Sequence, residues 1–218
     1  MWKALVFKEL RDVLPIACIA LLAYLACVAS LMGYPVLFDL FSAEEIPFLG
    51  GALNEFFVYI AIAFTIGLGL WQTVAENNRG TWLFLLHRPV GLRTIVGFKL
   101  AAGAGVYLLV SALPILIYAF WAATPRTHAS PFAWWMTKEA WHIWFFMLPC
   151  YFAAFLTGIR PSRWFGTRLL PLLAVGLLST LIATLTWDYW FLNHVAVILL
   201  CGMFSYIIFY VAQTRDFS

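Results

Sequence analysis

Residues 16–33 read IACIALLAYLACVASLMG and contain no charged side chain. Segments of this length and composition are typical of helices that cross a bilayer, because about 20 apolar residues span the hydrocarbon core. A second segment of the same kind, FFVYIAIAFTIGLGLW at residues 56–71, follows after a turn-rich connection. Together the two segments predict a helical membrane protein.

The composition of the whole chain supports this interpretation. Of its 218 residues, 64% are hydrophobic and 11% are charged, whereas an average soluble domain is about 45–50% apolar and about 25% charged. The apolar content excludes a soluble globule, and the abundance of Trp, Phe and Leu excludes a disordered chain. With 13 basic and 10 acidic residues and no basic block, no binding to nucleic acid is expected.

The length of the chain sets the number of spans. A helical span takes roughly 20 residues plus a connection, so a chain of 218 residues holds about six spans and little else. We therefore predict an all-α fold with one transmembrane domain, residues 1–218, and an amphipathic helix at residues 1–12 that lies in the membrane interface. The predicted spans are residues 13–33, 53–74, 100–122, 140–159, 169–187 and 193–212.

The basic residues predict the orientation of these spans. With six spans both termini lie on one side, and that side collects eleven of the 13 Lys and Arg residues, leaving only Arg126 and Lys138 opposite. Because cytoplasmic loops are enriched in Lys and Arg, we expect both termini in the cytoplasm of a cell-membrane protein. Tryptophans would anchor the outer interface; they are Trp121, Trp134, Trp135, Trp141, Trp187 and Trp190.

Several chemistries are disfavoured by what the predicted spans lack. No Asp, Glu, Lys or Arg lies in the middle of a span, so coupling to protons or sodium is not expected. No GxSG nucleophile motif occurs, and the Glu44–Glu45 pair lies in a Pro/Gly-rich loop rather than in a span. His128, His142 and His194 could together bind a metal on the outer face, but we interpret them as scattered interface histidines.

The chain also has no GxxxxGK[ST] sequence, so it does not bind ATP through a P-loop of its own. We therefore do not expect it to be an enzyme. If it moves a substrate uphill, the energy must come from outside the bilayer.

The most informative stretch is the cytoplasmic segment AENNRGTWLFLLHRPVGLRTIVGFK, residues 75–99. Gly80 can end the preceding helix, and Thr81 is suited to cap a new one. A short apolar helix at residues 82–86 would follow and end before Pro89. Such an apolar helix should not be left exposed to water, so it either lies on the membrane or docks into a partner's groove.

This segment resembles the loop between the second and third spans of type-2 ATP-binding-cassette (ABC) exporter permeases. The shared order is Glu76, Gly80–Thr81, the leucines of residues 83–86, Pro89, Arg93 and Lys99. The charged helix before the first span, with Lys8-Glu9-Leu10-Arg11, and the six spans are also similar to that family. The segment departs from the family pattern at Asn77-Asn78, where a second charge is common, and the chain has very small extracellular loops.

The resemblance implies a permease subunit of an ATP-driven exporter. Such a subunit pairs with a second permease protomer in a homodimer or heterodimer and carries cytoplasmic ABC ATPase subunits. ATP and Mg²⁺ would be bound by those ATPases, with no cofactor in this chain. The residues assigned to ATPase coupling are Glu76, Arg79, Gly80, Thr81, Trp82, Phe84, Leu85, Arg88, Pro89 and Arg93.

Under this hypothesis, Trp82, Phe84 and Leu85 would be the hydrophobic anchors and the arginines would pair with acids at the rim. Two alternatives remain open. The chain could be a non-transporting membrane subunit that tethers or regulates an ATPase or a maturation complex. It could also be a stand-alone channel or membrane enzyme.

Overall fold

The computed structural model describes residues 2–34, 46–49, 51–79, 91–127, 131–161, 167–186 and 189–214. Nearly all of these residues are helical, and the described part of the chain contains no strand. The elements are α1 (Trp2–Leu31), α2 (Ala52–Arg79), α4 (Leu92–Ala123), the 3-10 turn η1 (Trp134–Thr137), α5 (Lys138–Phe146), α6 (Leu148–Ile159), the 3-10 turn η2 (Thr167–Leu169), α7 (Leu170–Thr186) and α8 (Trp190–Thr214).

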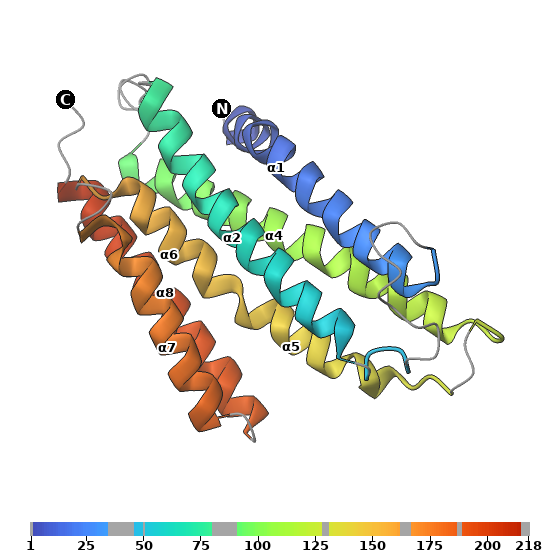
Figure 1. Ribbon diagram of the computed structural model, residues 1–218. Helices are drawn as coiled ribbons and strands as arrows, with labels where there is room; N and C mark the ends of the chain where they lie inside the picture. Colours follow the sequence, from blue (N-terminus) through green and yellow to red (C-terminus); the bar gives the residue numbers. More distant parts are fainter. Residues whose placement is uncertain are drawn as a thin grey trace.

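The prediction of an all-α polytopic membrane protein is confirmed. Six helical segments are long and apolar enough to cross a membrane: Val6–Leu31, Leu53–Glu76, Leu92–Ala123, Trp134–Ile159, Thr167–Leu185 and Trp190–Thr214. They form an elongated bundle, and α1 begins at the end where α8 finishes (Figure 1). We call this the terminal end and the other the distal end.

The first helix changes direction along its length. In Figure 1 the opening turns of α1 are seen almost end-on, whereas the remainder runs along the bundle. Pro15 lies inside this part of the helix and lacks the amide that would bond to the carbonyl of Arg11, which is a common cause of kinks. The opening turns, at the terminal end, therefore run in a different direction from the rest of α1.

One non-helical residue, Met147, divides the fourth span into α5 and α6. Pro149 accounts for the break, because its ring clashes with the carbonyl four residues earlier, at Phe145, and it offers no amide to that carbonyl. Pro149 lies in the first turn of α6, where proline is well tolerated. The break lets α5 and α6 follow slightly different directions within one span.

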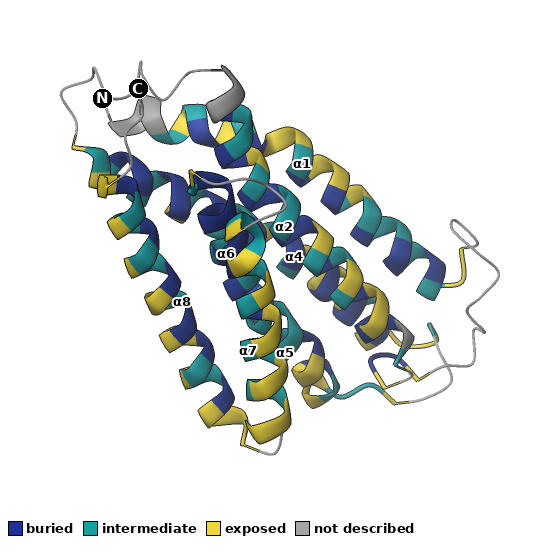
Figure 2. Ribbon diagram, turned by 60° about the vertical axis from the view of Figure 1, so that its left-hand side comes forward, coloured by how far each residue is buried: buried dark blue, intermediate teal, exposed yellow. Residues whose placement is uncertain are grey.

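Helix α6 lies at the centre of the bundle, packed against α2, α7 and α8 (Figure 2). All its residues except Cys150 and Phe152 are buried. Small residues allow α2 to approach closely: a Cβ on Gly69 would lie 2.7 Å from Ala154 Cβ, and one on Gly158 would overlap Thr73 Oγ1. Such small-residue contacts are typical of tightly packed membrane helices.

Helix α7 lies at the edge of the bundle and is the least enclosed span. Only 11% of its most apolar stretch is buried, against 61% of the corresponding stretch in the span that contains α6. Leucines on the outer face of α7 are exposed, as expected for a surface that meets lipid; they are Leu170, Leu173, Leu177, Leu181 and Leu185.

Candidate functional site

The segment predicted to couple to an ATPase lies mostly outside the described residues. Gly80, Thr81, Trp82, Phe84, Leu85, Arg88 and Pro89 fall in the undescribed stretch 80–90, and Arg79 is the last residue of α2, with its side chain undescribed. The structure describes the two helices that flank this stretch. The functional site is therefore built from the flanks, where Glu76 and Arg93 are described together with residues that the sequence did not single out.

A buried ion cluster joins three helices at the terminal end. Lys99 of α4 places its Nζ 2.8 Å from Glu9 Oε2 of α1 and 2.7 Å from Glu76 Oε1 of α2. The side chains of Lys99 and Glu9 are each only 1% exposed, and that of Glu76 is 10% exposed. One ammonium group thus bridges two carboxylates from different helices.

Lys8 closes the cluster from the outside. Its Nζ lies 2.7 Å from Glu76 Oε1 and 3.3 Å from Glu9 Oε1, and its side chain is 28% exposed. Asp12, four residues further along α1, also contacts Lys8 at 3.5 Å. We define the ion cluster as Lys8, Glu9, Glu76 and Lys99, whose formal charges sum to zero.

Charge balance decides whether this arrangement is tolerable. Removing a single carboxylate or ammonium from water costs several kcal/mol in a protein interior, and only well-placed opposite charges offset that cost. Here each carboxylate contacts both lysines, and three of the four lysine–carboxylate distances are 2.9 Å or less. The cluster is therefore stable only when α1, α2 and α4 hold their present arrangement.

Neutral hydrogen bonds extend the cluster to α6. Gln72 Nε2, one turn before Glu76, donates to the backbone oxygen of Lys99 at 3.2 Å. The Tyr151 hydroxyl of α6 donates to Gln72 Oε1 at 2.7 Å. Gly103 is necessary for this contact, because a Cβ at that position would overlap Tyr151 Oη and Gln72 Oε1.

A separate bond fixes the opening turns of α1 onto α2. Trp71 Nε1 donates to the backbone oxygen of Asp12 at 2.9 Å. Asp12 lies three residues before Pro15, in the turn of α1 where the helix bends. The hydrogen bond from Trp71 therefore ties this turn of α1 to α2.

Arg93 occupies a different position from Glu76. Its Nη2 donates to Gln213 Oε1 of α8 at 3.0 Å, at an exposed point of the terminal end. The ion cluster thus joins both flanks of residues 80–90, through Glu76 of α2 and Lys99 of α4, and Arg93 adds a contact from the start of α4 to α8. The structure does not bring Glu76 and Arg93 into a common contact.

Two of the three histidines considered as metal ligands lie close together. The rings of His142 and His194 are 5.2 Å apart at the distal end, and His128 lies outside the described residues. His194 also stacks on Phe145, with ring centroids 5.2 Å apart. Among the described residues, no group of three His, Cys, Asp or Glu side chains could hold a metal ion.

Sequence reasoning missed the pairing of Glu9 with Lys99. The helices extend further than the predicted spans, so Lys99, taken as the residue that leads into the third span, lies well inside α4. One signal was available: an ionisable residue within a long apolar helix usually faces the interior and has a partner. Glu9, Glu76 and Lys99 all meet that description.

Comparisons with family models, curated proteins and solved structures found no match for this chain.

Proposed function

We propose that this chain is the permease subunit of an ATP-driven ABC exporter, in which residues 80–90 receive motion from a separate ATPase. The observation that supports this proposal most directly is the ion cluster. It ties the last turns of α2 and the first turns of α4, which flank residues 80–90, to the helix that begins the chain.

This connection has a mechanical consequence. Lys99 and Glu76 lie on the two helices that enter and leave the 80–90 segment, and they contact each other at 2.7 Å. A push on the segment would therefore move α2 and α4 together instead of bending either one alone. Glu9 and Tyr151 would transmit the same displacement to α1 and α6.

The docking residues and the partners of this proposal come from the sequence of residues 75–99. Trp82, Phe84 and Leu85 would fill an apolar groove on the ATPase, because buried aromatic and aliphatic anchors dominate such interfaces. ATP and Mg²⁺ would be bound by that partner. A second permease protomer would complete the path of an amphipathic substrate across the membrane.

The docking step is tested by Leu85→Asp. Placing a carboxylate in an apolar groove should weaken association by several kcal/mol, because a buried charge without a partner is strongly disfavoured. Tagged chain is purified from its native membranes, and co-purifying P-loop subunits and ATP hydrolysis are measured. We expect both to be lost in Leu85→Asp while membrane expression is unchanged.

Tyr34→Asp is the matched control, because Tyr34 is 66% exposed and follows α1 at the distal end. The same charge placed there should leave the ATPase bound. Full retention of the ATPase by Leu85→Asp would remove the docking role. Retained binding without ATP-dependent substrate movement in vesicles would instead favour a non-transporting tether.

A further inference from the structure

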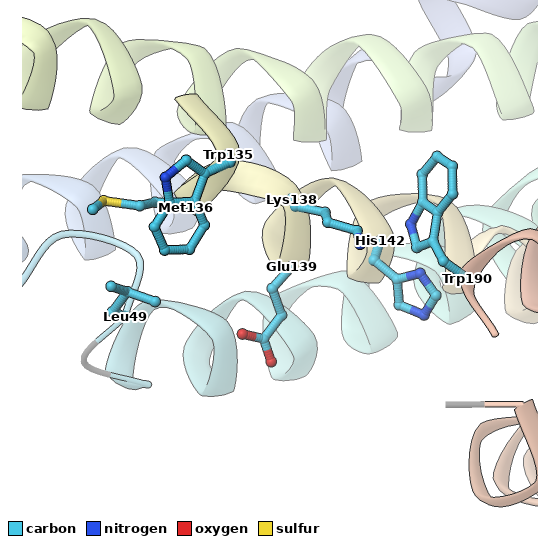
Figure 3. Close-up of a pocket in the computed structure, with 7 residues that line it drawn as sticks. All are labelled: Leu49, Trp135, Met136, Lys138, Glu139, His142 and Trp190. Atoms are coloured by element: carbon cyan, nitrogen blue, oxygen red, sulfur yellow. The ribbon is translucent and has the colours of Figure 1, made fainter. Parts of the chain in front are cut away.

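At the distal end, α5 and α8 enclose a pocket of about 250 Å³ that the proposed function does not use. We call it the distal pocket and define it by Leu49, Trp135, Lys138, Glu139, His142 and Trp190. Figure 3 shows the Glu139 carboxylate in the middle, with Trp135 on one side and the Lys138, His142 and Trp190 side chains on the other. The pocket thus presents a negative and a positive region side by side.

The two charges of the distal pocket are available to a ligand. Lys138 and Glu139 are exposed, and no ion pair joins either of them to another described residue. Lys138 Nζ lies 5.5 Å from the centre of the Trp190 ring, which holds it on the right-hand side of the pocket in Figure 3. Glu139 and the face of Trp135 remain free for a cation.

This chemistry matches one kind of molecule. An aromatic ring beside a carboxylate binds an ammonium group, and a lysine binds a phosphate. A ligand that fills both regions carries the two charges a few ångströms apart. The fourth span begins with η1 and α5, so the pocket lies at the level of the lipid headgroups. A ligand with these two charges at that level is a zwitterionic phospholipid.

A second cavity continues the same helix face into the membrane. This apolar slot of about 300 Å³, which we call the α7 slot, is lined by Phe146 and Cys150 together with residues of α2 and α7 that include Ile62, Gly176 and Thr180. Phe146 stacks on His142, with ring centroids 5.9 Å apart. The slot therefore begins one turn below the distal pocket.

The spacing of the two cavities fits a lipid. Glu139, His142 and Phe146 are separated by three and four residues, so they share one face of α5, and Cys150 follows just after the break at Met147. At 1.5 Å per residue, Glu139 and Cys150 are about 16 Å apart along the axis. This length matches one leaflet, which is half of a hydrocarbon core of about 30 Å.

We propose that the distal pocket and the α7 slot together bind one zwitterionic phospholipid. The ammonium group lies between Glu139 and Trp135, the phosphate contacts Lys138, and an acyl chain occupies the α7 slot. This binding requires no ATPase, so it stands or falls independently of the proposed export function.

The test uses the full chain in nanodiscs that contain equal amounts of phosphatidylethanolamine and phosphatidylglycerol. Retained lipids are counted by native mass spectrometry after release into mild detergent. We expect the wild type to retain phosphatidylethanolamine preferentially. Glu139→Gln should reduce its retention roughly tenfold, the size of one lost charge-assisted hydrogen bond, and leave phosphatidylglycerol little changed.

Two further variants test the phosphate contact and the acyl-chain site. Lys138→Met should lower the retention of both lipids, because both carry the phosphate. Gly176→Leu should also lower both by filling the α7 slot, and it should fold because a Cβ at Gly176 meets no atom within 4 Å. Gly105→Leu is its control, since Gly105 of α4 is equally open and does not line the slot.

Glu55→Gln, which removes an exposed carboxylate at the start of α2 outside the pocket, controls for Glu139→Gln. Equal retention of the two lipids by the wild type, or equal losses in Glu55→Gln and Glu139→Gln, would overturn the proposal. Displacement of the bound lipid by soluble phosphoethanolamine as readily as by lysophosphatidylethanolamine would also overturn it, in favour of a soluble zwitterion.

Discussion

The two ends of the bundle use the same residue types in opposite ways. At the terminal end, Lys99 and Glu9 are 1% exposed and lie 2.8 Å apart, whereas at the distal end Lys138 and Glu139 are adjacent in sequence and exposed. The first pair comes from two helices, which the pairing holds together. The second pair lies within one turn of one helix, so it joins no two helices by an ion pair and leaves both charges available.

This difference indicates where the molecule is rigid and where it can receive a ligand. A buried charge without its partner is strongly destabilising, so the terminal end resists any rearrangement that would separate α1, α2 and α4. An exposed charge contributes little to the free energy of unfolding, so removing it changes stability little. Removing one charge at each end should therefore have unequal effects on stability.

The largest effect is expected for Lys99→Met. It leaves the Glu9 and Glu76 carboxylates buried with only Lys8 to balance them, which should destabilise the protein by about 3–5 kcal/mol. Lys138→Met removes the same charge at the distal end and should change stability by less than about 0.5 kcal/mol. Thermal unfolding of both variants in the same detergent measures the difference.

A paired substitution tests the cause of this loss. If Lys99→Met acts through unpaired carboxylates, adding Glu9→Gln should restore a large part of the lost stability, because coupled residues do not contribute additively. Equal unfolding temperatures for Lys99→Met and Lys138→Met would mean that water reaches the ion cluster. The contrast between the two ends would then be wrong.

The next effect concerns two glycines in neighbouring helices. Gly158→Ala should destabilise the α2–α6 contact by about 1–3 kcal/mol, because the new methyl group overlaps Thr73 Oγ1. Gly176→Ala in α7 meets no atom within 4 Å and should be neutral or stabilising by up to about 1 kcal/mol, since alanine favours helix. Opposite shifts in the unfolding temperature are the expected result.

Two shifts of the same sign and size would contradict the central position of α6. They would mean that the contact at Gly158 relaxes as easily as the open surface of α7.

Hydropathy predicted the six spans. The structure divides the fourth span into α5 and α6, and Pro149 explains this break. Hydropathy did not predict which span is buried, because Leu148–Ile159 and Leu170–Thr186 are both apolar on every face. In a lipid environment an outward leucine costs nothing, so the sequence pattern that separates core from surface in a soluble helix is lost.

For the candidate site, the sequence predicted where residues lie along the chain but not which residues of different helices come into contact. Glu76 and Lys99 were expected near the two ends of the cytoplasmic segment 75–99, and the structure places them in α2 and α4. The contact of Lys99 with Glu9 depends on how α1 and α4 pack, which no local pattern encodes. The docking roles of Trp82, Phe84 and Leu85 remain predictions, since these residues lie outside the described part of the chain.

The smallest effect is expected where the terminal end connects to α6. Tyr151→Phe removes the hydroxyl that donates to Gln72 Oε1 at 2.7 Å but keeps the ring, so it tests this one hydrogen bond. Side-chain hydrogen bonds between membrane helices contribute about 0.6 kcal/mol on average and up to about 1.7 kcal/mol. We expect a loss of about 1 kcal/mol in thermal unfolding, because the Gln72 side chain is left with one partner fewer in a buried position. Tyr206→Phe, at a side chain 73% exposed on α8, is the control and should have no measurable effect. If Tyr151→Phe is equally silent, α6 is held by its close packing against α2 alone, and a displacement of the 80–90 flanks would not reach it through Gln72.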